Sequence, residues 1–210
     1  MPLYVPYEPG PAVVWTVLSC WLIFAAVWLV GWIYNLVRAP KVERRKISPS
    51  ILAGAGIAWL ASWFVPRSVW DVLALNSPVL SNAGVALVLA GTAFALWARA
   101  VLGTMWTGLP SQRAGHRLRT TGPFSIVRHP IYSGVLAMLA GTAMVYGFGV
   151  WTGPLIAGAV GLALKMRVEE NLLLEAFGPE YQAYRARVPA LLPLPRFGKK
   201  RETGERSLGA

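Results

Sequence analysis

The sequence predicts an all-α integral membrane protein with about five transmembrane helices. Of its 210 residues, 55% are hydrophobic and only 14% are charged, whereas a soluble domain of this size normally carries about 25% charged residues. Uncharged runs cover residues 12–37, 47–66, 72–98 and 130–164. Each run reaches the roughly 20 apolar residues that a membrane-spanning helix needs.

The last uncharged run is too long for one span. At ~1.5 Å per residue it would form a helix of about 50 Å, against a hydrocarbon core of about 30 Å. Turn-forming residues at 146–149 and at 152–154 lie near its middle. We therefore expect a tight helical hairpin and five spans in all; the alternative is four spans with one long, tilted helix.

The basic residues predict the orientation. The net charge is +11, and five spans place every one of the 20 Lys and Arg residues except Arg67 on the same side of the membrane. By the positive-inside rule, the N-terminus lies outside the cytoplasm, and the C-terminus and the candidate site lie within it. The positive charge is then a topology signal with anionic membrane lipid as its partner, and nucleic-acid binding is excluded.

The N-terminus predicts no removable leader, and the cysteine content predicts no cysteine-based metal site. Residues 1–11 contain no basic residue, and the first apolar run is longer than that of a cleavable signal peptide. Cys20 is the single cysteine and lies inside the first span, so it forms neither an internal disulfide nor a multi-cysteine metal site.

The chain divides into three parts. Residues 1–102 form an N-terminal scaffold of three transmembrane helices, residues 103–195 carry the chemistry, and residues 196–210 form a basic, flexible tail. The tryptophans of the first span are interpreted as lipid-facing or interfacial packing residues: Trp15, Trp21, Trp28 and Trp32.

Small residues predict a helix–helix contact, and a helix-breaking pair predicts a break. Gly84, Gly91 and Ala98 recur every seven residues along the third span, which predicts a close helix–helix contact. Gly178-Pro179 predicts a break between two short helices after the last span.

Two motifs lie at the ends of the predicted hairpin. Pro130 is expected to begin a helix, with Arg128 and His129 just before it and Tyr132 in its first turn. The free N–H groups of that helix end suit a carboxylate, such as the amino-acid end of a cofactor. A turn at 146–149 would bring this end close to residues 165–170.

Glu169 and Glu170 need partners, because adjacent carboxylates at the end of an apolar hairpin are costly unless they are paired or solvated. The candidate partners are Arg128, His129, Lys165 and Arg167. Such a mixed cluster suits a zwitterionic ligand. The alternative is that these residues only anchor helix ends at the lipid headgroups.

These motifs resemble the signature of the isoprenylcysteine carboxyl methyltransferase family. The resemblance covers roughly residues 102–193: a run from Gly115 to Gly134 with Arg128-His129-Pro130 at its centre, and a second run from Glu169 to Pro193. It implies a small all-α membrane methyltransferase that uses S-adenosyl-L-methionine. The cytoplasmic connecting loop and the C-terminal helices would form the cofactor pocket, and a tunnel would admit a lipidic or prenylated substrate, either a small molecule or a protein C-terminus.

The resemblance also implies site residues. Residues near the reacting centre or holding the substrate would be Arg167, Glu169 and Arg128. Contacts to the cofactor would come from His116, Leu118, Gly122, Pro123, Arg128, His129, Tyr132 and Glu170.

Three positions depart from the family pattern. Phe124 stands where a tyrosine is common, Arg119 stands at a usually apolar position, and Lys165 stands where arginine is frequent. Because lysine lacks the planar bidentate grip of a guanidinium, we expect Arg167 or Arg128 to bind the substrate.

The expected reaction is methyl transfer to a carboxylate of an isoprenylcysteine-like or other lipidic acceptor. A carboxylate is already ionised at pH 7, whereas a thiol or amine acceptor needs a base, for which His129 or Glu169 is the candidate. Two alternatives remain: an NAD(P)H-dependent membrane reductase, since the fold superfamily also resembles sterol reductases, and a non-catalytic membrane scaffold.

Overall fold

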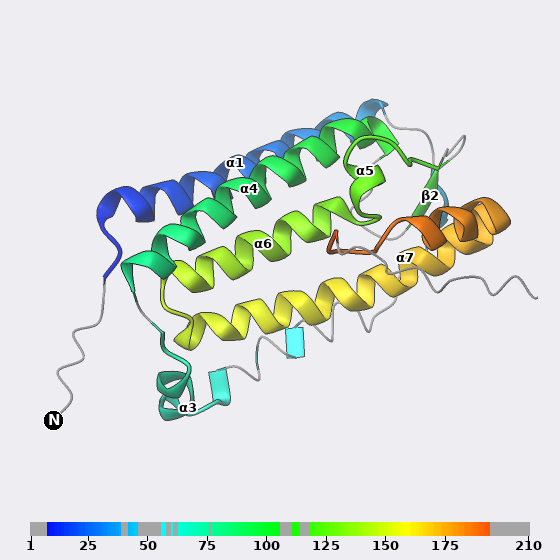
Figure 1. Cartoon of the computed structure of the whole chain (residues 1–210). Coiled ribbons are helices and arrows are strands. Elements are labelled where there is room, and N and C mark those ends of the chain that lie inside the picture. Colours follow the sequence, from blue (N-terminus) through cyan, green and yellow to red (C-terminus); the bar gives the residue numbers. More distant parts are fainter. Residues whose placement is uncertain are drawn as a thin grey trace, which may run out of the picture.

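The computed structural model describes residues 8–38, 42–45, 56–57, 60, 63–75, 77–105, 111–113 and 118–193. Within these residues the chain is mainly helical (Figure 1). The α-helices are α1 (Pro11–Arg38), α3 (Arg67–Val72), α4 (Pro78–Leu102), α5 (Pro123–Ile126), α6 (Pro130–Val145) and α7 (Thr152–Arg187). Two 3-10 turns, η1 (Gly103–Met105) and η2 (Gly149–Trp151), and two short strands, β1 (Val42–Arg45) and β2 (Ser111–Arg113), complete the described elements.

The helices confirm an all-α integral membrane protein. Three of them are long and apolar enough to cross a membrane: Pro11–Arg38, Pro78–Met105 and Gly149–Arg187. A fourth apolar helix, α6, has 16 residues, which corresponds to about 24 Å. The span predicted at 47–66 and the tail predicted at 196–210 lie largely or wholly outside the described residues.

The predicted helical hairpin is confirmed. Helix α6 ends at Val145, the chain turns through Gly147 and Phe148, and α7 begins at Thr152 after η2. Positive φ angles at Gly147 (80°) and Phe148 (56°) make the turn tight. Helices α6 and α7 therefore run side by side, which brings the start of α6 to the same end of the molecule as the later part of α7 (Figure 1).

Helices α4 and α6 make the closest contact of the bundle, as the seven-residue repeat of small residues predicts. A Cβ atom on Gly91 would lie 2.7 Å from the carbonyl oxygen of Gly134, and one on Gly134 would lie 2.6 Å from that of Gly91. Gly84 and Gly141 face each other in the same way, at 2.6 Å in both directions. Small residues let the two backbones touch, and this fixes the position of α6.

Helix α1 packs on the other side of this pair. Val17 and Cys20 of α1 form a buried cluster with Val88 and Val145, and the Trp21 indole N–H donates to the Thr142 hydroxyl over 3.1 Å. Most large side chains on the remaining faces of α1 are exposed, which suits contact with lipid.

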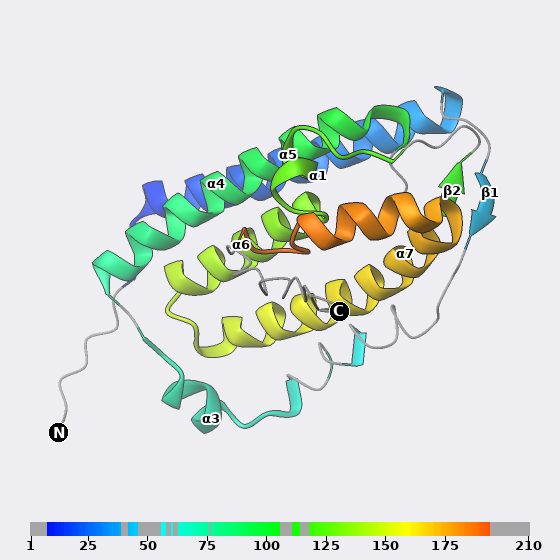
Figure 2. The ribbon, with the colours of Figure 1, turned by 45° about the vertical axis from the view of Figure 1, so that its right-hand side comes forward.

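The predicted break at Gly178-Pro179 is confirmed, but the prediction of two short helices is wrong, because only the helix after the break is short. The φ of 46° and ψ of −120° at Gly178 interrupt α7, and Pro179 follows. The residues after the break form a short helix that folds back along α7 (Figure 2). The break leaves the residues before it in one long helix that is continuous with the last span.

The fold-back brings residues 188–191 to the start of α6. The Arg128 N–H donates to the carbonyl of Pro189 over 2.8 Å, and the His129 N–H donates to that of Ala190 over 3.0 Å. The Ser133 hydroxyl donates to the carbonyl of Leu191 over 2.6 Å. The two parts of the sequence motif are thus joined through their backbones.

Strands β1 and β2 were not predicted, because the sequence predicts an all-α chain with a connecting loop before Pro130. They pair antiparallel, with Val42 opposite Arg113 and Arg45 opposite Ser111. Both are too short for an alternating pattern to be recognisable, and their partners lie far apart in the sequence.

We predict that Gly91→Ala destabilises the protein by about 1–3 kcal/mol, the usual cost of overpacking a tight contact. The added methyl group meets the Gly134 backbone, which cannot move alone. Gly158→Ala is the matched control in a helix, because its methyl group meets only the end of the Leu139 side chain. Thermal unfolding in detergent measures both; an equal melting temperature for the two variants would contradict this packing.

Candidate functional site

Arg128 and Glu170 form a buried ion pair that joins the two sequence motifs. Glu170 Oε1 accepts from Arg128 Nε over 3.0 Å and from Nη2 over 2.5 Å. The side chains are 5% and 13% exposed. Arg128 Nη1 also donates to the carbonyl oxygens of Val188 (2.5 Å) and Arg185 (3.3 Å). The guanidinium thus holds α7 and the segment after it against the start of α6. Arg128 was one of the partners predicted for the two glutamates.

His129 lies between the two carboxylates. Its Nε2 is 3.3 Å from Glu170 Oε1, and its Nδ1 is 3.9 Å from Glu169 Oε2. The ring stacks on that of Tyr132, with centroids 5.3 Å apart and planes 3° from parallel. His129 is the N-cap residue of α6, and Pro130 begins the helix as predicted.

Lys165 completes the charged cluster from α7. Its ammonium group is 3.9 Å from Glu169 Oε1, one helical turn away, and 5.3 Å from the centroid of the Tyr132 ring. Arg185 Nε lies 3.6 Å from Glu170 Oε2. Each carboxylate therefore has at least one cation beside it, which offsets the cost of placing two acids in a largely apolar setting.

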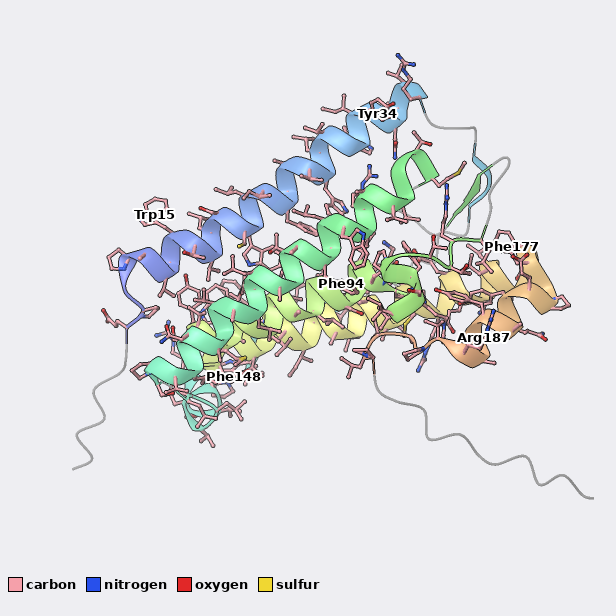
Figure 3. All side chains as sticks on the ribbon, turned by 45° about the horizontal axis from the view of Figure 1, so that its top comes forward. Trp15, Tyr34, Phe94, Phe148, Phe177 and Arg187 are labelled. Atoms are coloured by element: carbon pink, nitrogen blue, oxygen red, sulfur yellow. The ribbon has the colours of Figure 1, made fainter. Side chains whose placement is uncertain are left out.

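A cavity of about 190 Å³ opens beside this cluster. Its wall combines charged groups with many apolar and aromatic side chains, an arrangement typical of small-molecule sites. The lining residues are Trp28, Leu102, Met105, Leu118, Arg119, Phe124, Arg128, His129, Pro130, Ile131, Tyr132, Lys165, Glu169, Leu172, Leu173, Ala176, Phe177, Tyr181 and Tyr184. Phe177 and Arg187, which belong to this end of α7, lie at the opposite end of the bundle from Phe148 and the hairpin turn (Figure 3).

The sequence-predicted site residues divide into those that line the cavity and those that do not. Lining the cavity are Leu118, Arg128, His129, Tyr132 and Glu169. His116 lies outside the described residues.

Four other predicted residues do not line the cavity. Glu170 lies behind Arg128 and His129 and holds both of them. Gly122, with a φ of 61°, and the buried Pro123 shape the turn that begins α5. Arg167 is exposed and points away from the cavity-lining face of α7.

Sequence reasoning missed the part that the N-terminal half contributes. Trp28, interpreted as a lipid-facing or interfacial packing residue, lines the cavity together with Leu102 and Met105. The available signal was a helical stripe: Trp28, Gly31 and Asn35 lie on one face of α1, where Asn35 is buried and Gly31 is packed against the Arg99 guanidinium. A buried asparagine in an apolar helix marks an inward face.

Phe124 lacks the hydroxyl that a tyrosine would provide, but its backbone carbonyl makes a polar contact. Tyr184 donates its hydroxyl to the Phe124 carbonyl oxygen over 2.6 Å. This bond ties α5 to the returning end of α7, so the wall formed by Phe124 and Tyr184 is held through the backbone of Phe124.

Comparison with known proteins shows what this chain is similar to. Residues 80–180 match the family model described as phospholipid methyltransferase. The chain is 30% identical over 122 residues to protein-S-isoprenylcysteine O-methyltransferase B of Arabidopsis thaliana, covering 54% of this chain and 59% of that protein. The predicted resemblance to the isoprenylcysteine methyltransferase family is therefore confirmed over about half of the chain.

Two bacterial relatives extend the comparison. The chain is 36% identical over 94 residues to methanethiol S-methyltransferase 2 of Bradyrhizobium diazoefficiens, covering 44% of this chain and 34% of that protein. It is 33% identical over 135 residues to a cobalt-zinc-cadmium resistance protein of Cupriavidus metallidurans, covering 64% of this chain and 58% of that protein. The chain thus spans between about a third and three fifths of the length of these curated relatives.

A solved structure shares the fold. The eukaryotic intramembrane Ras methyltransferase, isoprenylcysteine carboxyl methyltransferase, superposes with a TM-score of 0.51 at 22% identity, covering 70% of this chain and 54% of that one. At this identity the likeness concerns the arrangement of helices alone.

Proposed function

We propose that this protein is a membrane-embedded methyltransferase that uses S-adenosyl-L-methionine and methylates a lipidic acceptor, with an isoprenylcysteine-like carboxylate as the first candidate. The observation that carries the proposal is the cavity at which Arg128, His129 and Tyr132 of one motif meet Lys165 and Glu169 of the other. The methyltransferases among the relatives support the same chemistry.

The residues present fit this cofactor. Its amino-acid end carries one carboxylate and one ammonium group, and the cavity wall offers the Arg128 guanidinium and the carboxylate of Glu169. Its adenine ring is flat and apolar on both faces, and Phe124 and Phe177 supply aromatic wall. When bound, the cofactor would supply a methyl group activated by a positively charged sulfur.

The chain's own residues would bind and orient the two substrates and exclude water from them. Arg128 and His129, fixed by Glu170, would hold the polar end of the cofactor at the start of α6. Glu170 is then a positioning residue. A carboxylate acceptor needs no base, so rate enhancement would rest on placing its oxygen in line with the methyl group and excluding water. For a thiol acceptor, Glu169 is the candidate base.

Lys165 is a better candidate than Arg167 for contact with the acceptor. Positions 165 and 169 are one helical turn apart and share a face of α7, and both line the cavity. Arg167 is exposed. The Lys165 ammonium lies 3.9 Å from Glu169 Oε1. An acceptor carboxylate would compete with Glu169 for this ammonium group, so the acceptor could be bound and then released.

The acceptor's apolar part would lie along the wall formed by Trp28, Leu102 and Met105. The charged cluster would face the cytoplasm, as the distribution of Lys and Arg predicts.

Titration of the detergent-purified protein with S-adenosylhomocysteine, the demethylated cofactor, tests the proposal. We predict micromolar binding by calorimetry, weakened at least about tenfold in His129→Ala because two contacts of the site are lost. Arg187→Ala is the control, because this exposed side chain donates to the Ala183 carbonyl oxygen of its own helix. Binding of NADPH alone would favour a reductase, and binding of neither ligand would favour the scaffold alternative.

Methylation of an S-prenylated cysteine derivative in vesicles tests the acceptor. We predict that Lys165→Met raises KM for this acceptor and that Lys165→Arg restores it, while affinity for S-adenosylhomocysteine stays within about twofold, since the ammonium group faces the acceptor. Arg167→Ala is the matched control and should change neither value. If Arg167→Ala raises KM and Lys165→Met does not, the assignment of the two residues must be exchanged.

A further inference from the structure

Arg99 is a buried cation near the end of a membrane-spanning helix. It lies in the last turn of α4 and is 7% exposed. An arginine at such a position usually extends its stem so that the charged group reaches the lipid headgroups. Arg99 instead turns toward α1. A charge inside a transmembrane segment is costly to place and usually has a function, and the proposed reaction does not yet give Arg99 one.

The Arg99 guanidinium fills the space that Gly31 leaves on α1. A Cβ atom on Gly31 would lie 2.9 Å from Arg99 Cζ and would overlap with Nη2. Gly31 follows Trp28 by three residues, so the two positions are neighbours on one face of the helix. Because Trp28 lines the cavity, the contact with Arg99 fixes the face of α1 that carries this part of the wall.

The same guanidinium holds the end of α4. Arg99 Nη1 donates to the Gly103 carbonyl oxygen over 2.7 Å, and the Gly103 N–H donates back to the Arg99 carbonyl oxygen. Gly103 has a φ of 53° and begins η1, which ends at Met105. A cation also suits the negative end of a helix. Arg99 therefore fixes the path of the chain between Leu102 and Met105, which both line the cavity.

We propose that Arg99 is a positioning residue for the acceptor: it holds the α1 part and the α4–η1 part of the apolar wall at the spacing that the acceptor's apolar chain requires. This inference rests on the proposed function, in which that chain lies along the wall. Arg99 itself does not line the cavity. The charged cluster belongs to the start of α6 and to α7, so it keeps its place when Arg99 is changed.

Arg99→Met tests the inference, because it removes the guanidinium and keeps an unbranched stem. In vesicles, we expect KM for an S-farnesylcysteine derivative to rise roughly tenfold, as for the loss of a buried charged hydrogen bond. Affinity for S-adenosylhomocysteine, measured by calorimetry, should stay within about twofold of wild type. For an S-geranylcysteine derivative the rise in KM should be smaller, since its shorter chain covers less of the wall.

Gly31→Ala is a second variant that keeps the cation and displaces it. The added methyl group meets the end of the flexible Arg99 side chain, so we expect a smaller loss of thermal stability than for Arg99→Met and a rise in acceptor KM in the same direction. Trp21→Phe is the matched control. It removes the hydrogen bond from α1 to Thr142, away from the cavity, and should leave acceptor KM within about twofold.

Unchanged acceptor KM in both Arg99→Met and Gly31→Ala would overturn the inference and leave the proposed function intact. A parallel loss of cofactor affinity, or an equal rise in KM for Trp21→Phe, would overturn it too, because either result shows a general loosening of the bundle. If the wild-type protein binds S-adenosylhomocysteine but methylates neither prenylated derivative, the wall does not receive such an acceptor and the inference is refuted. Absence of cofactor binding by the wild-type protein would refute the proposed function itself, and the inference with it.

Discussion

The site depends on one buried cation. Arg128 pairs with Glu170 on α7, donates to the carbonyl oxygens of Arg185 and Val188, and is tied through its own N–H to Pro189. A buried charge persists only when it is paired and its hydrogen bonds are made, and removal of one partner of such a pair typically costs about 3–5 kcal/mol. The start of α6, the charged part of α7 and the returning segment are therefore held as one unit.

The membrane-spanning helices place this unit. Glycine contacts fix α6 against α4, and the tight turn at Gly147 and Phe148 sets α7 beside α6. The apolar hairpin thus brings the start of α6 and the charged part of α7 to the same end of the bundle. Helix α1 then adds Trp28 to the wall, so a cavity for a partly polar, partly apolar ligand forms between elements that are distant in sequence.

Local signals allowed much of this to be predicted. The uncharged runs predict the helices, Pro130 predicts the start of α6, and the cost of unpaired acids predicts the partners of Glu169 and Glu170. Two features depend on long-range geometry instead: the pairing of β1 with β2, and the return of the chain after Gly178 to Arg128 and His129. The exposed position of Arg167 follows from local geometry, because the two residues between it and either Lys165 or Glu169 are more than half a helical turn. That spacing separates it from the face that carries Lys165 and Glu169.

The most direct test of the account is a double-mutant cycle on Arg128→Met and Glu170→Gln, with affinity for S-adenosylhomocysteine and thermal stability measured for each protein. If this pair assembles the site, each single change lowers both quantities, and the double variant loses no more than the worse single variant. The coupling should be about 1–3 kcal/mol, as for residues in direct contact. Additive losses, or unchanged cofactor affinity in both single variants, would contradict the account.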